Sequence, residues 1–291
     1  MGICRASTIC IFLKFAGTER HFEERVRGQT VEDKKIRVYL CEDSLEGILS
    51  AVHAAYHSRY GHRFIRLQEG DYIEQDLFSD YVQVRTDFAK ADSVARSVRQ
   101  KISVQAWDSI LKASLHYRTG KAQDIYRFLN YGYQMGGSVI NYIGEEHIQR
   151  VMFDCKTVSK EYDRMMGFTR FQELEDGSLF ARIGPKSNLV PLLAGHFADR
   201  FPEERWTIYD ENRHLMAYHV PNLGWNMMKG DLSKYLPEEN VSQNQREMED
   251  CWKTFFETIA IEARKNLKYQ QQMLPKYYRK YFSKSGDKSF D

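Results

Sequence analysis

The sequence lacks the patterns that most readily place a protein in a class. Its five cysteines are scattered along the chain, and no two have the C-x-x-C spacing of a zinc ribbon or a thioredoxin-like site. No stretch approaches the roughly 20 consecutive apolar residues that a membrane-spanning helix requires. The apolar stretch at residues 9–15 is short and contains a lysine, unlike the core of a signal peptide. We therefore predict a cytoplasmic protein with free thiols and no membrane partner.

Neither the overall charge nor the glycines indicate a nucleotide or nucleic-acid site. The 42 lysines and arginines nearly balance the 40 acidic residues, and a net charge of +2 is too small to indicate nucleic-acid binding. Thr119-Gly120-Lys121 lacks the earlier glycine of a phosphate-binding loop, and the glycines near residue 136 lack its lysine. The sequence predicts no cofactor, so any anion site has to come from a local cluster of cations.

The chain holds enough apolar residues for a sizeable core. Hydrophobic residues make up 42% of the 291 positions, which suffices for one large domain or two closely packed ones. Residues 1–34 show no sustained hydrophobic period, so we expect a poorly ordered extension there. We place a single compact domain over residues 36–282 and a flexible tail over 283–291. Within the domain, a helical part covers about 36–166 and a β-rich part about 167–282.

Hydrophobic periodicity predicts the elements of the helical part. Alternation over 36–40 indicates a strand, and Asp43 and Glu46 have the spacing of a capping box at the start of a helix. Weaker strand signals occur near 64–67 and 82–84. The helical period predicts helices over 44–59, 87–117, 121–135 and 145–166.

Two hairpins and two helices are predicted for the β-rich part. Alternating runs flank Asp176-Gly177, a strong hairpin signal, and a second hairpin turns at residues 210–213. A helix over 188–200 lies between the hairpins, a connector follows over 221–240, and a long amphipathic helix covers 241–264. The expected fold class is α+β, with a helical N-terminal half packed with a hairpin–helix–hairpin antiparallel sheet and a long C-terminal helix.

Three histidines have a spacing that could hold a metal ion. His53 and His57 are four residues apart on a predicted helix, and His62 follows closely. No Asp, Glu or Cys joins them at helical spacing, however, and closed metal sites take four ligands. A solvent-exposed helix flank explains them better, so we predict no metal site.

Polar residues gather at the ends of elements in the β-rich part. His196 lies in the helix between the hairpins, and Asp210 and Arg213 lie at the second turn. One interpretation is a catalytic group in which His196 transfers a proton, with Arg170 and Arg182 gripping phosphate from the first hairpin. The alternative is an Asp–Arg pair that only braces a turn.

The C-terminal segment is locally basic and aromatic. From residue 264 onward it carries eight lysines and arginines against two aspartates, interleaved with tyrosines. Cations for phosphates and rings for unstacked bases are typical of single-strand binding, whereas a tail whose rings pack on the body is the alternative. The candidate nucleic-acid-binding residues are Arg264, Lys276, Tyr277, Tyr278, Arg279 and Lys280.

Several runs of residues together resemble one bacterial family. They include GFTRF at 167–171, LVPLLAGHFADRFP at 189–202, WTIYDENR at 206–213 and the segment 252–278. These runs resemble an uncharacterised bacterial domain known as a probable DNA metabolism protein, and the likeness extends over about 36–282. The chain departs from the family at residues 42–47, and at Asp163-Arg164, where the family tends to carry His-Arg.

The resemblance implies a pathway without implying a reaction. In that family the domain accompanies a radical-SAM protein linked to DNA repair, and in some chains it is fused to a uracil-DNA glycosylase domain. Two functions therefore stay open. The first is a nucleic-acid-binding accessory protein with the radical-SAM protein and DNA as partners. The second is an enzyme acting on nucleic acid or a nucleotide through His196 and the arginine set.

Overall fold

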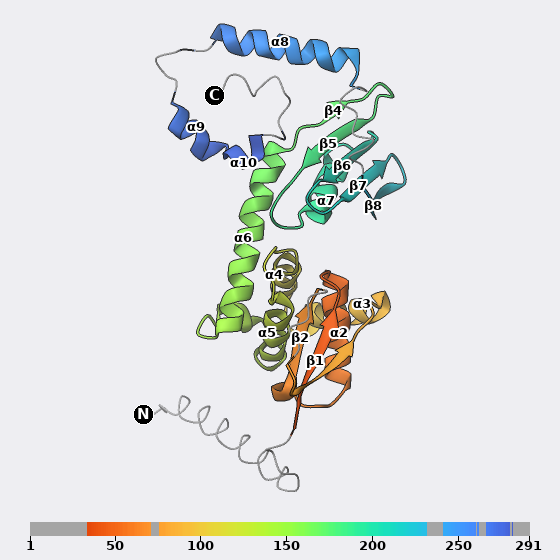
Figure 1. Cartoon of the computed structure of the whole chain (residues 1–291), viewed down its shortest axis with the longest axis vertical. Helices are drawn as coiled ribbons and strands as arrows, with labels where there is room; N and C mark the ends of the chain where they lie inside the picture. The colour runs from red at the N-terminus through yellow and green to blue at the C-terminus, as the bar shows by residue number, and fades with distance from the viewer. Residues whose placement is uncertain are drawn as a thin grey trace, which may run out of the picture.

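The structure is a computed structural model, and it describes residues 34–70, 76–231, 241–259, 261, 266–279 and 281. All but the last residue of the expected extension over 1–34, and all of the expected tail over 283–291, lie outside the described residues. Helix α6 (Glu146–Phe168) runs lengthwise through the molecule (Figure 1). It contributes Ile148 and Val151 to one buried core and Val158 and Met165 to a second.

The first core contains a three-stranded parallel sheet with the order β2-β1-β3. Its strands are β1 (Ile36–Cys41), β2 (Ile65–Glu69) and β3 (Ser79–Gln83). The sequence predicted three strand-like pieces at nearly these places. It did not predict that they pair into one sheet, because strand pairing depends on contacts between distant residues. The N-terminal half is therefore not only helical, as we expected, but also contains a three-stranded sheet.

Helices complete the first core. They are α2 (Leu45–His57), α3 (Phe88–Lys101), α4 (Val104–Ser114) and α5 (Lys121–Met135), with the short 3-10 turns η3 (His62–Phe64) and η4 (Gly136–Asn141). The helix predicted over 87–117 is broken after Ile102, because the Ser103 hydroxyl accepts the Ala106 N–H and starts a new helix. Helix α2 is capped by Ser44 rather than Asp43, with Ser44 Oγ accepting the Gly47 N–H.

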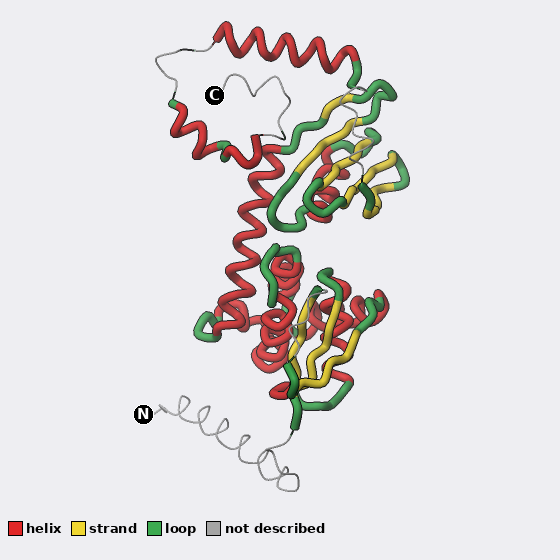
Figure 2. The backbone as a smooth tube through the Cα atoms, in the orientation of Figure 1, coloured by secondary structure: helices red, strands yellow, loops and turns green. Residues whose placement is uncertain are grey.

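The second core contains a five-stranded sheet with the order β4-β5-β6-β7-β8. Figure 2 shows the two sheets as separate groups of strands. Helix α7 (Val190–Arg200) connects β5 to β6. The strands are β4 (Gln172–Glu173), β5 (Leu179–Ile183), β6 (Trp206–Asp210), β7 (Leu215–Val220) and β8 (Gly224–Lys229).

This sheet is mixed, so the predicted antiparallel hairpin–helix–hairpin sheet is wrong in its centre. Both predicted hairpins form, but β5 and β6 run parallel. The reason is that α7 carries the chain back across the sheet, as a crossover helix does between parallel strands. Strand β8 also lies within the connector expected over 221–240, and it pairs antiparallel with β7. The broader assignment to mixed helix and strand, α+β, is confirmed.

The C-terminal part is helical. Helix α8 (Gln243–Ile259) lies at one end of the molecule (Figure 1), and α9 (Leu267–Met273) and α10 (Lys276–Arg279) follow. Within the residues that the structure describes, no helix is long and apolar enough to cross a membrane.

Candidate functional site

The structure does not bring the three predicted catalytic residues together. Asp210 is fully buried, and its Oδ2 accepts a hydrogen bond from Arg213 Nη1 at 2.9 Å. The same guanidinium donates to the carbonyls of Pro185 and Lys186. In the described part of the chain, no hydrogen bond or ion pair joins His196 to either residue, and its ring lies edge-on to Phe197. Asp210 and Arg213 therefore brace the β6–β7 turn, which is the second of the two interpretations.

The two arginines that were predicted to bind phosphate, Arg170 and Arg182, contact other groups of the chain. Arg170 Nη1 donates to the carbonyls of Gly167 and Thr169. Arg182 Nε lies 3.8 Å from Glu211 Oε2. Both guanidiniums are thus held by groups of their own chain.

The predicted tail residues divide into buried and exposed ones. Tyr278 is 7% exposed, and its hydroxyl donates to Glu161 Oε1 at 3.0 Å. Its ring has no open face for a base, so the structure assigns Tyr278 to packing. Tyr277 is 41% exposed, Lys276 is exposed, and Arg279 Nε donates to the Leu274 carbonyl. Arg264 and Lys280 lie outside the described residues.

The histidines of the first helix do not form a metal site. The rings of His53 and His57 stack on each other, whereas His62 Nδ1 is hydrogen-bonded to the Tyr126 hydroxyl at 2.6 Å. Over the described ranges, no group of three His, Cys, Asp or Glu side chains could hold a metal ion.

Burial raises the pKa of the Cys41 thiol to about 12, so this cysteine is an unreactive core residue.

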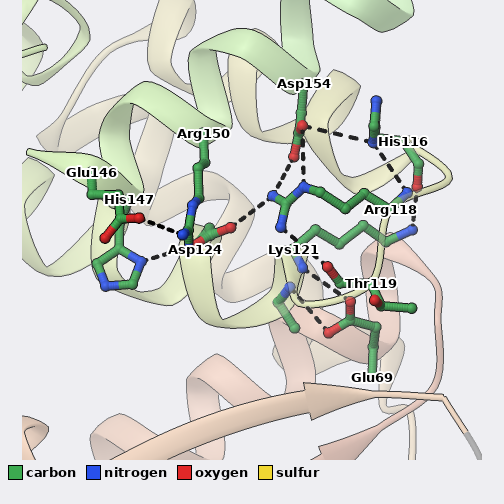
Figure 3. A network of polar contacts seen from close by, with 11 residues as sticks. Glu69, His116, Arg118, Thr119, Lys121, Asp124, Glu146, His147, Arg150 and Asp154 are labelled. Atoms are coloured by element: carbon green, nitrogen blue, oxygen red, sulfur yellow. Dashed lines mark hydrogen bonds and ion pairs between the residues drawn. The ribbon is translucent and has the colours of Figure 1, made fainter.

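A network of charged residues that the sequence analysis missed lies where α4, α5 and α6 meet (Figure 3). Two aspartates, Asp124 on α5 and Asp154 on α6, are each 1% exposed. Arg118 bridges them: its Nη2 lies 2.7 Å from Asp124 Oδ2 and 2.6 Å from Asp154 Oδ2. Buried charges require such partners, because desolvation strongly penalises an unpaired carboxylate.

The N-terminus of α5 is closed to an outside anion. Glu69, at the end of β2, accepts the backbone N–H groups of Lys121 and Ala122 at 3.0 and 3.2 Å. Lys121 Nζ is buried and lies 2.7 Å from Asp43 Oδ1. A carboxylate thus occupies the position where a phosphate would lie on a P-loop helix. The geometry agrees with the rejection of Thr119-Gly120-Lys121 as a phosphate-binding loop.

His147 extends the network toward the surface. Its Nδ1 lies 2.6 Å from Asp124 Oδ1, and its side chain is 26% exposed. Because an ionised carboxylate only accepts hydrogen bonds, Nδ1 carries a proton and Nε2 is left as the lone-pair nitrogen of the neutral ring. Nε2 points away from Asp124 (Figure 3). Asp124 therefore fixes both the orientation and the tautomer of His147.

His116 lies at the other end of the network. Its Nδ1 accepts the Arg118 backbone N–H at 3.1 Å, which places the proton of the neutral ring on Nε2. Nε2 is buried and has no hydrogen-bond partner among the described residues. Burial lowers the pKa of His116 below 6.5, and the positive charges of Arg118 and Lys121 add to that effect against the opposing charge of Asp154.

This lowered pKa predicts a stability that falls in acid. The folded protein keeps His116 neutral at a pH where the unfolded chain binds a proton, so stability is full above pH 6.5 and declines as the pH falls toward the folded pKa. The expected slope from this group is at most about 1.4 kcal/mol per pH unit. Urea unfolding measures the free energy of unfolding at pH 7.5 and at pH 5.5. The decrease in this free energy between the two pH values should be smaller for His116→Gln than for the natural protein. Equal losses in the two proteins would contradict the assignment.

An open polar pocket adjoins His147. It has a volume of about 430 Å³ and is lined by Arg66, Gln123, Arg127, Tyr131, Glu145 and His147. Alternation along β2 turns Arg66 outward between the buried Ile65 and Leu67. Glu145 and His147 lie at the start of α6, which no side chain caps, so the partial positive charge of the helix N-terminus faces this region.

The two arginines of the pocket, like several others in the described part of the chain, have no carboxylate partner there. Arg127 donates only to the Ile65 carbonyl, at 3.5 Å, and within the described residues neither Arg66 nor Arg127 forms an ion pair with a carboxylate. Carboxylate partners are present for Arg96, Arg118, Arg150, Arg182 and Arg213. Two guanidiniums without such partners in one pocket can bind an anion bidentately.

One sequence signal could have found this site. Gln123, Arg127 and Tyr131 are spaced four residues apart on a helix that was predicted over these residues, so they form a polar stripe on one face. Arg66 and His147 carry no such signal, because only the fold brings β2 and α6 beside that stripe.

Comparisons with known proteins identify a family and no activity. A family described as a domain of unknown function, DUF4130, matches residues 119–283. The match includes every pocket residue except Arg66. No curated protein matches the chain, and no solved structure matches it. Because the family match spans more than half of the sequence, the chain belongs to this uncharacterised family, DUF4130.

Proposed function

We propose that this chain binds nucleic acid, and that phosphate groups of the nucleic acid lie in the pocket beside His147. The observation that carries the proposal is the pair of arginines, Arg66 and Arg127, which line one pocket without a carboxylate partner among the described residues. The uncapped N-terminus of α6 adds backbone donors on the same side. Phosphate contacts of this kind supply most of the affinity of sequence-independent binding.

The resemblance to a DNA metabolism family supports the same class of ligand. In this proposal the protein is an accessory of a radical-SAM repair enzyme, and it holds DNA while the partner performs the chemistry. The exposed Lys276, with Arg279 beside it, could extend the phosphate-binding surface. Neither the partner nor the extension is needed for the pocket to bind phosphate, so each can be tested separately.

The first test is the salt dependence of binding to single-stranded DNA. The double variant Arg66→Ala/Arg127→Ala should reduce the slope of log affinity against log salt by about 1.4 units, because each phosphate contact on a single strand releases about 0.7 counterion and two contacts are lost. Fluorescence anisotropy with a labelled oligonucleotide between 50 and 200 mM salt measures the slope.

Arg96 provides the matched control for that test. It is exposed, lies on α3, and is paired with Asp92, so Arg96→Ala removes one guanidinium away from the pocket. Its slope should stay near that of the natural protein. If the slope of log affinity against log salt decreases by the same amount in the double variant and in the control, the pocket is not the phosphate site. A loss confined to Lys276→Ala/Arg279→Ala would place the site in the C-terminal segment.

A second candidate function is favoured by one observation. The 2.6 Å contact between Asp124 and His147 Nδ1 leaves Nε2 as a possible proton acceptor beside an anion pocket, which is the arrangement of a general base. The chain would then be an enzyme acting on nucleic acid or a nucleotide, with His147 in place of the predicted His196. Turnover of such a substrate that is lost in His147→Ala and retained in His196→Ala would establish this function.

A further inference from the structure

The shape of the pocket limits how much of a nucleic acid can enter it. Its volume of about 430 Å³ lies in the range of small-molecule sites, about 300–1,000 Å³, and is too small for a strand of several nucleotides. One wall is already fixed, because Gln123 Oε1 accepts the Leu67 backbone N–H at 2.9 Å and so ties α5 to β2. The pocket therefore suits one nucleotide unit.

The cations in the pocket suit a group with several acceptor oxygens. Arg66 and Arg127 carry two full positive charges, and the same pocket holds one carboxylate, that of Glu145. A phosphodiester carries a single negative charge, whereas a phosphate monoester carries about −1.5 to −2 at pH 7 and has three strong acceptor oxygens. Two guanidiniums offer enough donors for all three oxygens of the monoester, whereas a phosphodiester has only two charged oxygens to accept them.

The carboxylate of Glu145 disfavours a continuous nucleic-acid backbone in the pocket. It lines the same pocket. The pKa of Tyr131 is raised mainly by burial, and the charge of Glu145 and its hydrogen bond with the Tyr131 hydroxyl raise it further. A carboxylate repels a second phosphate in the next position along a strand, whereas it accepts hydrogen bonds from a hydroxyl or amino group of the same nucleotide. The ring of Tyr131 offers an apolar surface for a sugar or base.

We infer that the pocket recognises a phosphate monoester on a nucleotide, and so the phosphorylated end of a strand or a free mononucleotide rather than an internal phosphodiester. This inference rests on the proposed function for its class of ligand, and it adds which phosphate is bound. Arg66 and Arg127 bind the monoester oxygens, Glu145 accepts from the sugar or base, and Tyr131 packs against it.

The test compares oligonucleotides of one sequence that end in a 5′-phosphate, a 3′-phosphate or hydroxyl groups only. One phosphorylated form should bind about tenfold more tightly than the hydroxyl form, since hydrogen bonds to an ionised acceptor are roughly twice as strong as neutral ones. Arg127→Gln should remove that preference, and Arg96→Ala should keep it. Competition by a nucleoside monophosphate and by inorganic phosphate distinguishes a strand end from a free nucleotide and from phosphate alone.

The outcomes separate this inference from the proposed function. Equal affinity for all three oligonucleotides, with binding still dependent on Arg66 and Arg127, would overturn end recognition and leave nucleic-acid binding in place. Binding of the monophosphate without binding of any oligonucleotide would support the monoester site and overturn the proposed function. Competition by inorganic phosphate as strong as by the monophosphate would overturn the role given to Glu145 and Tyr131.

Discussion

Replacing Arg118 with methionine is expected to lower the free energy of unfolding by about 3–5 kcal/mol. The methionine removes the guanidinium that bridges Asp124 and Asp154, and it leaves two carboxylates that are each 1% exposed without their shared cation. Breaking a buried ion pair on one side costs far more than a surface pair contributes, because the remaining charge stays desolvated. Urea unfolding at pH 7 measures the loss.

Two further variants decide whether the loss comes from the buried charges. Arg150 also contacts Asp124, at 3.6 Å, but its side chain is 47% exposed, so Arg150→Met should cost less than about 1 kcal/mol. Adding Asp124→Asn and Asp154→Asn to Arg118→Met should recover part of the stability, since the neutral amides no longer need a cation. A loss of equal size in Arg118→Met and Arg150→Met would contradict this account of the network.

Replacing Tyr278 with alanine is expected to cost about 3–5 kcal/mol, the range of large aromatic truncations in a core. The ring packs against Phe168 at 5.6 Å between centroids, and its hydroxyl bonds to Glu161, which also accepts the backbone N–H groups of Lys186 and Ser187. The truncation opens a cavity and removes a donor from a buried carboxylate. Thermal unfolding measures the change as a drop in Tm.

The neighbouring tyrosine is the control for this prediction. Tyr277 is 41% exposed, and its hydroxyl accepts from Asn212 at the β6–β7 turn, so Tyr277→Ala should cost no more than about 1 kcal/mol. Equal and small effects at both positions would mean that the C-terminal segment does not pack on the second core. That result would restore Tyr278 as a residue free to stack on bases.

Local patterns predicted the helices of this fold better than they predicted its sheets. The period over 121–135 has the same bounds as α5, and the prediction over 145–166 differs from α6 by one or two residues at each end. Helices depend on neighbours three and four residues apart, which a sequence displays. The parallel pairing of β5 with β6 joins strands on either side of α7, and no local pattern specifies it.

The candidate site was missed for a related reason. His147 and Asp124 are 23 residues apart, and Arg118 and Asp154 are 36 apart, so only tertiary structure reveals these contacts. The predicted site residues His196, Asp210 and Arg213 were chosen because they lie at ends of neighbouring elements. That criterion found a real Asp210–Arg213 contact, but it could not distinguish a turn brace from a site.

The most direct test of the central claim, that phosphate groups of a nucleic acid lie beside His147, is an NMR measurement of the imidazole nitrogens. The His147 resonances can be assigned by their absence in His147→Gln, because the chain has nine histidines. Addition of saturating single-stranded DNA should shift the Nε2 resonance of His147 in the natural protein, and the shift should vanish in Arg66→Ala/Arg127→Ala. DNA that binds with unchanged His147 resonances would contradict the claim and place the nucleic acid elsewhere on the protein.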